Sequence, residues 1–328
     1  MPGGSMNSHL IDDESIEQIL TSVKKQPNVS LDKLNYKFNF NRLNLPDPSS
    51  VDIKEIVGID GSVKLITDRI SYFNQSYNNY QTYVIDPIIF VRSVSVHSKS
   101  PFIKEEKFVM QEDLDQYKLE NKDRSIGLKQ IESKLLKLRE FKHIEEVIKE
   151  MEYGSILLLD MALISLISLE DDLKLISIIK ECKKKGINIV GWVKDSDLKT
   201  EDGLLYTTAA RVSSLQNNIK PPWYVVHPMF MDKDISSFIY HPPWGNFCFR
   251  TDIVPSSLSV NEIFEVLMEC SKHSLGYPLV LYKAHHKVKI TQNDANNMFR
   301  KMKKISASKG TFIDQPGLKP FHESYLDL

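Results

Sequence analysis

Two aspartates each follow an apolar run and could together hold a divalent cation. Asp60 ends the run from Ile56 to Ile59, and Asp160 ends the run from Ile156 to Leu159. A carboxylate in such apolar surroundings is costly unless a metal, a basic side chain or a helix N-terminus neutralises it. Two strand-borne acids suit Mg²⁺ or Mn²⁺, which bind a few carboxylate oxygens and complete their shells with water and phosphate. An aspartate that only hydrogen-bonds its own turn is the alternative for Asp60.

A third acid is then expected from a helix that faces the same end of the sheet. Glu140 fits, because Leu136 and Ile144, four residues to either side, place it at the border of an apolar helix face. Glu132 is the rival candidate on the same helix. A glutamate on a lysine-rich helix is otherwise commonly a solvated partner of lysine, so both readings stay open for either residue.

Four further residues could act on a phosphate. Tyr277 stands directly before Pro278, at the expected first turn of a helix, and His285 follows eight residues later. Histidine titrates near neutral pH and can give or take a proton, although a packed or exposed histidine is the commoner case. Lys194 and Arg250 lie at or near strand ends, where basic groups beside clustered acids suit phosphate positioning and DNA binding. As plain surface cations they would be unremarkable.

The elements that must position these residues begin with a hairpin. The pattern predicts a buried strand over 56–60, a tight turn at Gly61-Ser62 and a returning strand over 63–66. The stretch 80–96 is rich in β-branched and aromatic residues, and Asp86-Pro87 predicts a bend or an edge position there. Helical spacing of apolar residues predicts a helix from Ser125 to Met151.

A βαβ unit follows, and it normally joins two parallel strands by a right-handed crossover. Its parts are a strand over 155–159, a helix over 170–185 that ends at Gly186, and a strand over 187–193. Later strands are expected near 223–230, 237–240 and 246–253, and later helices at 261–273, 278–287 and 294–304. A hairpin, then βαβ, with helices on both sides, predicts an α/β fold: an RNase H-like mixed sheet flanked by helices, with an N-terminal arm and C-terminal helices.

The domain limits follow from one compositional break, at residues 45–50, which contain two prolines. We expect an N-terminal arm over 1–50 that begins with a helix near 16–23, an RNase H-like domain over 51–310 and a C-terminal tail over 311–328. Residues 1–5, ahead of Met6, resemble a cloning remnant.

Composition excludes several classes of protein. The chain has 328 residues, with 42 Lys and Arg against 43 Asp and Glu and 41% hydrophobic residues, so it is neither a polycationic coat protein nor mainly disordered. No apolar run is long enough for a membrane helix, and no secretory signal is seen. Cys182, Cys248 and Cys270 are expected to be buried thiols in a reducing cytoplasm. No P-loop, dinucleotide loop or serine nucleophile elbow is present, which argues against ATP hydrolysis.

In their order and spacing these pieces resemble the NurA family of DNA-end-processing nucleases, over about residues 57–290. The resemblance rests on six short motifs: Gly58-Ile59-Asp60-Gly61-Ser62, Leu138-Arg139-Glu140, Ile156 to Asp160, Val190-Gly191-Trp192-Val193-Lys194, Phe249-Arg250-Thr251-Asp252, and Gly276-Tyr277-Pro278 through His285.

The resemblance implies an RNase H-like, Mn²⁺-dependent nuclease, with Mg²⁺ as a possible substitute, that degrades DNA from 5′ ends and also cuts single strands. It implies a cytoplasmic homodimer that docks on a hexameric HerA-type translocase during end resection for recombinational repair. By position, Asp60, Glu140 and Asp160 would be metal ligands, while Tyr277 and His285 would orient the phosphate or water and assist proton transfer.

One departure separates the chain from the family pattern. Family members usually follow the second strand aspartate with glycine and a small residue, whereas Met161-Ala162 stands here. Two alternatives therefore accompany the nuclease reading: a catalytically weak or inactive DNA-binding adaptor for the translocase, and an RNase H-like enzyme that acts on RNA or hybrids.

Overall fold

The structure is a computed structural model that describes most of the chain. The described residues are 37–45, 53–67, 70–76, 79–85, 88–99, 103–110, 124–164, 169–194, 196–231, 234–272, 274, 276–308 and 311–314. The helix predicted near 16–23 and the bend at Asp86-Pro87 lie outside these residues.

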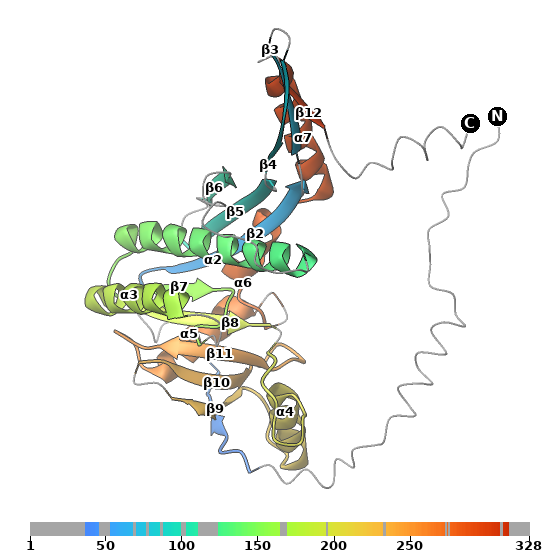
Figure 1. Cartoon of the computed structure of the whole chain (residues 1–328). Coiled ribbons are helices and arrows are strands. Elements are labelled where there is room, and N and C mark those ends of the chain that lie inside the picture. The colour runs from blue at the N-terminus through green and yellow to red at the C-terminus, as the bar shows by residue number, and fades with distance from the viewer. Residues whose placement is uncertain are drawn as a thin grey trace, which may run out of the picture.

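A nine-stranded sheet within the described residues forms the centre of the molecule, in the order β1-β9-β10-β11-β8-β7-β2-β5-β6 (Figure 1). Its strands are β1 (Asn41–Arg42), β2 (Ile56–Thr67), β5 (Ile88–His97), β6 (Ile103–Met110), β7 (Ile156–Leu159), β8 (Asn188–Val193), β9 (Trp223–Met231), β10 (Ser236–His241) and β11 (Phe249–Val254). β7 is parallel to β2 and to β8, and all other neighbours are antiparallel. The order β6-β5-β2-β7-β8 is that of an RNase H-like sheet, so the predicted α/β fold class is confirmed.

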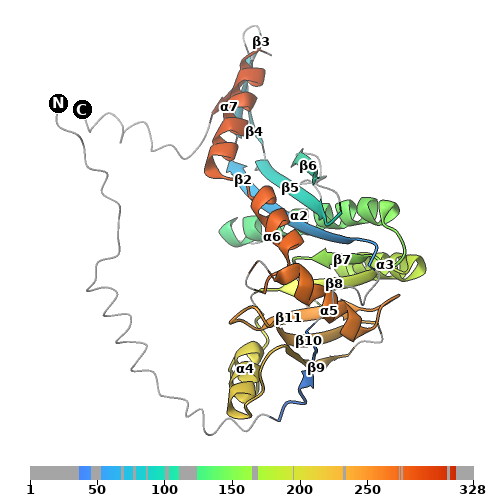
Figure 2. The same cartoon turned by 180° about the vertical axis from the view of Figure 1, so that it is seen from behind.

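Helices cover both faces of this sheet. α2 (Arg124–Glu150) and α3 (Leu169–Lys185) lie on one face, and α5 (Val260–Ser271) and α6 (Leu279–Val288) lie on the other (Figures 1 and 2). Leu157 and Leu159 pack with α2 and α3, whereas Ile156 and Leu158 pack with α5 and α6, and all four are fully buried. A strand buried on both faces reads as a continuous apolar run, which is why β7 was detectable from the sequence.

The expected turn at Gly61-Ser62 is wrong. β2 continues through both residues to Thr67, and Gly61 pairs with Ser93 of β5 in an unbroken antiparallel ladder. The next two strands, β3 (Ile70–Ser76) and β4 (Asn79–Ile85), pair with each other and not with β2. Glycine at position 61 has another reason, which is the close approach of α2.

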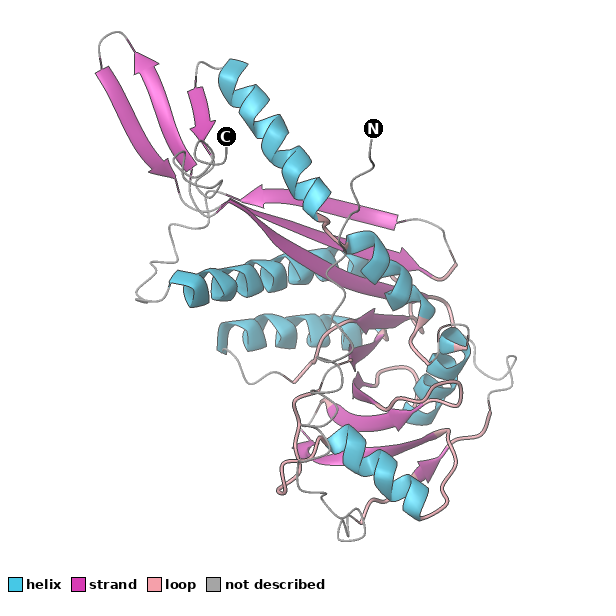
Figure 3. Ribbon diagram, turned by 90° about the vertical axis from the view of Figure 1, so that its right-hand side faces the viewer, coloured by secondary structure: helices cyan, strands magenta, loops and turns pink. Residues whose placement is uncertain are grey.

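A smaller sheet projects from the tip of β2 and β5, in the order β12-β3-β4, beside α7 (Gln292–Ser308) (Figures 1 and 3). Its strand β12 (Thr311–Asp314) pairs with β3, so the start of the segment expected as a tail joins this sheet. Similarly, β1 pairs with β9, so part of the expected N-terminal arm joins the main sheet. The expected domain limits stay predictions.

One helix escaped sequence prediction. α4 (Tyr206–Gln216) buries the small residues Ala209, Ala210, Ser213 and Ser214, which give no large apolar periodicity. The helices expected at 125–151 and 170–185 correspond to α2 and α3, and Gly186 ends α3 with a positive φ of 68°. Among the described residues, no helix is long and apolar enough to cross a membrane.

Candidate functional site

The register of two parallel strands brings Asp60 and Asp160 together. Ile59 of β2 pairs with Leu159 of β7, so the two aspartates occupy the next equivalent positions of adjacent strands. Side chains alternate along a strand, and Asp60 and Asp160 therefore point to the face that α6 covers, as Ile156 and Leu158 do. This convergence follows from topology, because the two residues are 100 positions apart in the chain.

Two basic side chains reach the same carboxylates. His285 of α6 places Nδ1 2.8 Å from Asp60 Oδ2 and 3.9 Å from Asp160 Oδ2. Lys194, directly after β8, donates from Nζ to Asp160 Oδ2 at 2.5 Å. Gly58 lets α6 come this close, because a Cβ there would lie 2.8 Å from the main-chain carbon of Val280. The Lys194 predicted for DNA binding thus lies inside the acidic cluster.

Glu140 approaches from the opposite face of the sheet, through the gap that Gly61 leaves. A Cβ at position 61 would lie 2.4 Å from Glu140 Oε1 and 2.6 Å from Leu136 Cδ1. The Glu140 carboxyl group is buried and directly adjoins the residue that follows Asp60. Glu132 lies eight residues earlier on α2, about 12 Å along the helix axis, and so cannot take this position. Between the two rival glutamates, the geometry favours Glu140.

Burial and mutual repulsion disfavour the ionisation of Asp60 and Glu140. Burial, and then the charge of Asp160, raises the pKa of Asp60, against the opposing effects of His285 and the Gly61 N–H. Burial, followed by the charges of Asp60 and Asp160, raises the pKa of Glu140 to about 8. Carboxylates that disfavour their own ionisation in this way gain the most from a neighbouring cation.

Tyr277 closes one side of the cluster. Lys194 Nζ lies 4.6 Å from the centre of its ring, and the ring also packs edge-on against Trp192. Burial, and then the nearby charge of Asp160, raises the pKa of the Tyr277 hydroxyl. The sequence-predicted residues Asp60, Glu140, Asp160, Tyr277, His285 and Lys194 are therefore neighbours in the fold.

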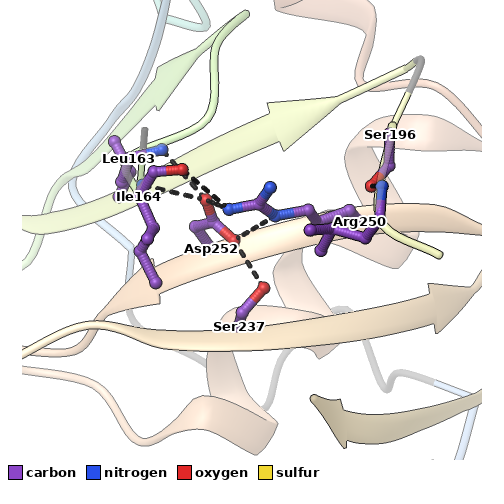
Figure 4. Close-up of polar contacts among 7 residues, drawn as sticks. Leu163, Ile164, Ser196, Ser237, Arg250 and Asp252 are labelled. Atoms are coloured by element: carbon purple, nitrogen blue, oxygen red, sulfur yellow. Dashed lines mark hydrogen bonds and ion pairs between the residues drawn. The ribbon is translucent and has the colours of Figure 1, made fainter. Parts of the chain in front are cut away.

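Arg250 does not belong to this group. Only 5% of it is exposed, and its guanidinium donates from Nε to Asp252 Oδ1 at 2.9 Å and from a terminal nitrogen to Asp252 Oδ2 at 2.8 Å (Figure 4). Arg250 forms an internal ion pair, because Arg250 and Asp252 lie on the same face of β11 and each neutralises the other, and its contact with DNA stays a prediction.

Asp252 also helps to build the site, although the sequence did not predict this role. Its Oδ2 accepts from the main-chain N–H groups of Leu163 and Ile164 at 3.0 and 3.2 Å, and its Oδ1 accepts from Ser237 at 2.6 Å (Figure 4). These bonds fix the segment that follows Asp160. Gly191 lets that segment lie against β8, since a Cβ there would be 2.6 Å from the Met161 carbonyl oxygen. The Met161-Ala162 departure therefore does not displace Asp160 from the cluster.

His143 was also missed. It is fully buried on α2, three residues after Glu140, and its Nδ1 lies 2.8 Å from Ser93 Oγ. The Ser93 hydroxyl also donates to the Asp60 carbonyl oxygen at 3.4 Å. An isolated histidine on a charged helix gave no sequence signal for this role beneath the site.

The donor set fits a divalent cation. Asp60, Asp160 and His285 each offer a ligand atom, and these atoms lie within 4.8 Å of one another. The Glu140 carboxyl group lies near this group, on the other side of Gly61. Carboxylate oxygens with one imidazole nitrogen suit Mn²⁺ or another hard-to-borderline divalent ion.

Comparison with solved structures reports the same fold. The NurA nuclease from Sulfolobus solfataricus superposes with a TM-score of 0.52 at 15% sequence identity, over 90% of this chain and 94% of that one. The likeness to NurA that the motifs indicate is confirmed for the fold.

Two endonuclease V structures are also similar, at lower scores. Human ENDOV gives a TM-score of 0.39 at 12% identity, over 78% of this chain and 88% of that chain. Ciona intestinalis Endonuclease V in complex with inosine-containing DNA gives 0.38 at 12% identity, over 88% of this chain and 100% of that chain. Neither a protein-family model nor a curated protein sequence matches the chain.

Proposed function

We propose that this protein is a divalent-metal-dependent nuclease that hydrolyses phosphodiester bonds in DNA. The observation that carries the proposal is the convergence of Asp60, Asp160 and His285 on one point of an RNase H-like sheet, with Glu140 directly beside them. Buried acids that repel one another and have raised pKa values are typical of a site that holds a cation.

The side chains divide the work according to their exposure. Asp60, Asp160 and Glu140, all largely buried, would hold the cation, which when bound lowers the pKa of a water molecule and stabilises charge on phosphate oxygens. The His285 side chain is 54% exposed, so it can exchange a proton with substrate or solvent. Lys194 and Tyr277 lie together on the adjoining side, where an ammonium group and a phenol can orient a phosphate.

The finer assignment rests on the NurA likeness. We propose Mn²⁺ as the preferred ion, with Mg²⁺ as a substitute, and cleavage both from 5′ ends and within single strands. A homodimer that works with a HerA-type hexameric translocase in DNA end resection, in the cytoplasm, is part of the same proposal. The order of the motifs in the sequence and the shared fold support it.

Cleavage of end-labelled DNA tests the proposal. Linear duplexes and single strands that carry a 5′ or a 3′ label are incubated with Mn²⁺, Mg²⁺ or a chelator, and an RNA strand of the same sequence is included. We expect metal-dependent digestion of DNA that is lost in Asp60→Asn. The matched control is Asp234→Asn, which removes a surface aspartate paired with Lys183 and should cleave as wild type does.

The outcomes distinguish the DNA nuclease from the two alternatives. Full activity of Asp60→Asn refutes the site. Preferred cleavage of RNA or hybrids shifts the substrate, whereas metal-independent DNA binding without cleavage, also in the presence of a HerA-type partner, identifies an adaptor.

A further inference from the structure

The loop between β10 and β11, residues 242–248, carries aromatic side chains into solvent beside the acidic cluster. Phe247 is 63% exposed and Trp244 is 37% exposed. The other two tryptophans, Trp192 and Trp223, are fully buried. Stacking of a flat apolar ligand on this exposed pair would remove aromatic surface from water, which is favourable.

Strand pairing places this loop at the same end of the sheet as the acids. β8 ends at Val193 opposite Arg250, and β10 and β11 join beyond that point, next to Lys194. β11 is two strands away from β7, so its start lies about 10 Å from Asp160 across the sheet. The loop and the acidic cluster therefore lie next to each other at the same end of the sheet.

The loop also packs directly against the segment that carries Tyr277. Gly276 has a φ of 91°, and a Cβ there would lie 2.5 Å from Pro242 Cγ. At the other end of the loop, the ring of Phe249 lies 6.3 Å from the ring of Tyr277. Contacts at both ends hold the loop in a fixed relation to the site.

Basic groups flank the aromatic pair. Lys272 Nζ lies 5.8 Å from the centre of the Trp244 ring, and Lys194 stands on the side of the acids. Burial raises the pKa of the Cys248 thiol to about 12, and the guanidinium of Arg211 on α4 is close enough to oppose that shift. α4 lies at the end of the sheet where β8 ends (Figures 1 and 2).

We infer that the 242–248 loop binds the unpaired bases of a single strand, which stack on Trp244 and Phe247 while Lys272 and Arg211 contact the strand's phosphates. Aromatic faces interleaved with cations are the usual composition of a surface that binds single strands without sequence preference. The inference rests on the proposed function in one respect, because the strand bound here would be the one that the acidic cluster cleaves.

Tryptophan fluorescence offers a direct test, because only Trp244 among the three tryptophans is exposed. Full-length protein is titrated in chelator with an oligothymidylate of about 15 nucleotides, or with a duplex of the same length. We expect quenching by the single strand. Trp244→Ala and Phe247→Ala should each weaken single-strand binding about 5-fold or more, as measured by anisotropy of a labelled oligonucleotide.

Controls separate stacking from other effects. Trp244→Phe keeps an aromatic face and should retain binding without the quenching signal. Tyr153→Ala removes a side chain that is 70% exposed at the opposite end of the sheet and should bind as wild type does. Unchanged single-strand affinity in both alanine variants overturns the inference, and that result would instead fit a loop that contacts a protein partner.

The assay is independent of cleavage, because the chelator prevents metal binding. Aromatic-dependent binding by a protein that never cleaves DNA would refute the proposed function and leave the stacking loop standing. If the protein cleaves DNA but both alanine variants bind single strands as wild type does, the proposed function stands and the stacking loop is refuted.

Discussion

Two carboxylate sites lie on the same sheet, and they are built in opposite ways. Asp252 of β11 is fully buried and accepts five hydrogen bonds, from Leu163, Ile164, Ser237 and twice from Arg250. Each of its oxygens is satisfied by the protein, and its charge is balanced within the pair. It has no capacity left for a ligand.

The acidic cluster is incomplete by comparison. Asp60 and Asp160 face each other, with Glu140 beside them, and the two basic side chains that reach the aspartates are partly open to solvent: Lys194 is about one-third exposed and His285 is half exposed. The comparison teaches that an ion pair with saturated oxygens stabilises the fold, while acids left in mutual repulsion mark a place where a further cation binds.

The largest expected effect separates activity from stability at the acidic cluster. Asp160→Asn should lower metal-dependent cleavage roughly 1,000-fold, since a lost carboxylate removes several kcal/mol of charge stabilisation at the metal. The free energy of unfolding without metal should change by about 1 kcal/mol or less, because solvent screens the partly exposed Lys194 and because repulsion of Asp60 is relieved. Urea titration beside the cleavage assay measures both, and a strongly destabilised variant would contradict the comparison.

The reverse is expected at the internal pair. Asp252→Asn should lower the free energy of unfolding by about 3 kcal/mol, because it removes the negative charge that the buried Arg250 guanidinium pairs with. Urea denaturation measures the loss. Arg250→Met combined with Asp252→Asn should recover part of it, since no unpaired charge remains. A single variant as stable as wild type would show that the pair is not the stabilising element.

The raised pKa of Glu140 should make the free energy of unfolding depend on pH. Its pKa is raised from 4.5 to about 8 by burial and the two aspartates, so the metal-free folded state binds its proton more tightly than the unfolded state does. Stability from this group is fully present below pH 4.5 and is lost as pH rises through 8, by on the order of 2 kcal/mol between pH 6 and 9.

Urea denaturation in chelator at both pH values measures this loss. Glu140→Gln should reduce the pH dependence, although Asp60, whose pKa is also raised, contributes with the same sign. Added Mn²⁺ should restore stability at pH 9, because the cation favours the ionised carboxylates. Equal stability at the two pH values in wild type without metal would contradict the prediction.

The smallest effect concerns Lys194, which competes with a metal for Asp160 Oδ2. Lys194→Met should raise Mn²⁺ affinity by about 5-fold or less, the equivalent of an exposed ion pair, while cleavage falls. Calorimetric titration should show the higher Mn²⁺ affinity, and the cleavage assay should show the lower rate that is expected when Lys194 also positions the phosphate. Lys184→Met, on the exposed surface of α3, is the matched control.

Local patterns in the sequence determined much of this protein. The continuous apolar runs predicted β7 and β8, the apolar periodicity predicted α2 and α3, and the order of the motifs predicted the fold and gathered Asp60, Asp160, Glu140, Tyr277, His285 and Lys194 as candidates. Such predictions succeed because burial of an entire strand or helix face constrains many neighbouring residues at once.

Only the tertiary structure decided the roles that depend on distant partners. Arg250 and Lys194 look alike in the sequence, because both are basic residues at strand ends. Arg250, however, pairs with Asp252 in the interior, whereas Lys194 reaches Asp160 at the carboxyl ends of β7 and β8. Gly61 likewise suggested a turn, whereas it gives Glu140 room beside Asp60. A single charge or glycine takes its meaning from the residues that the fold brings against it, and those lie on strands and helices far along the chain.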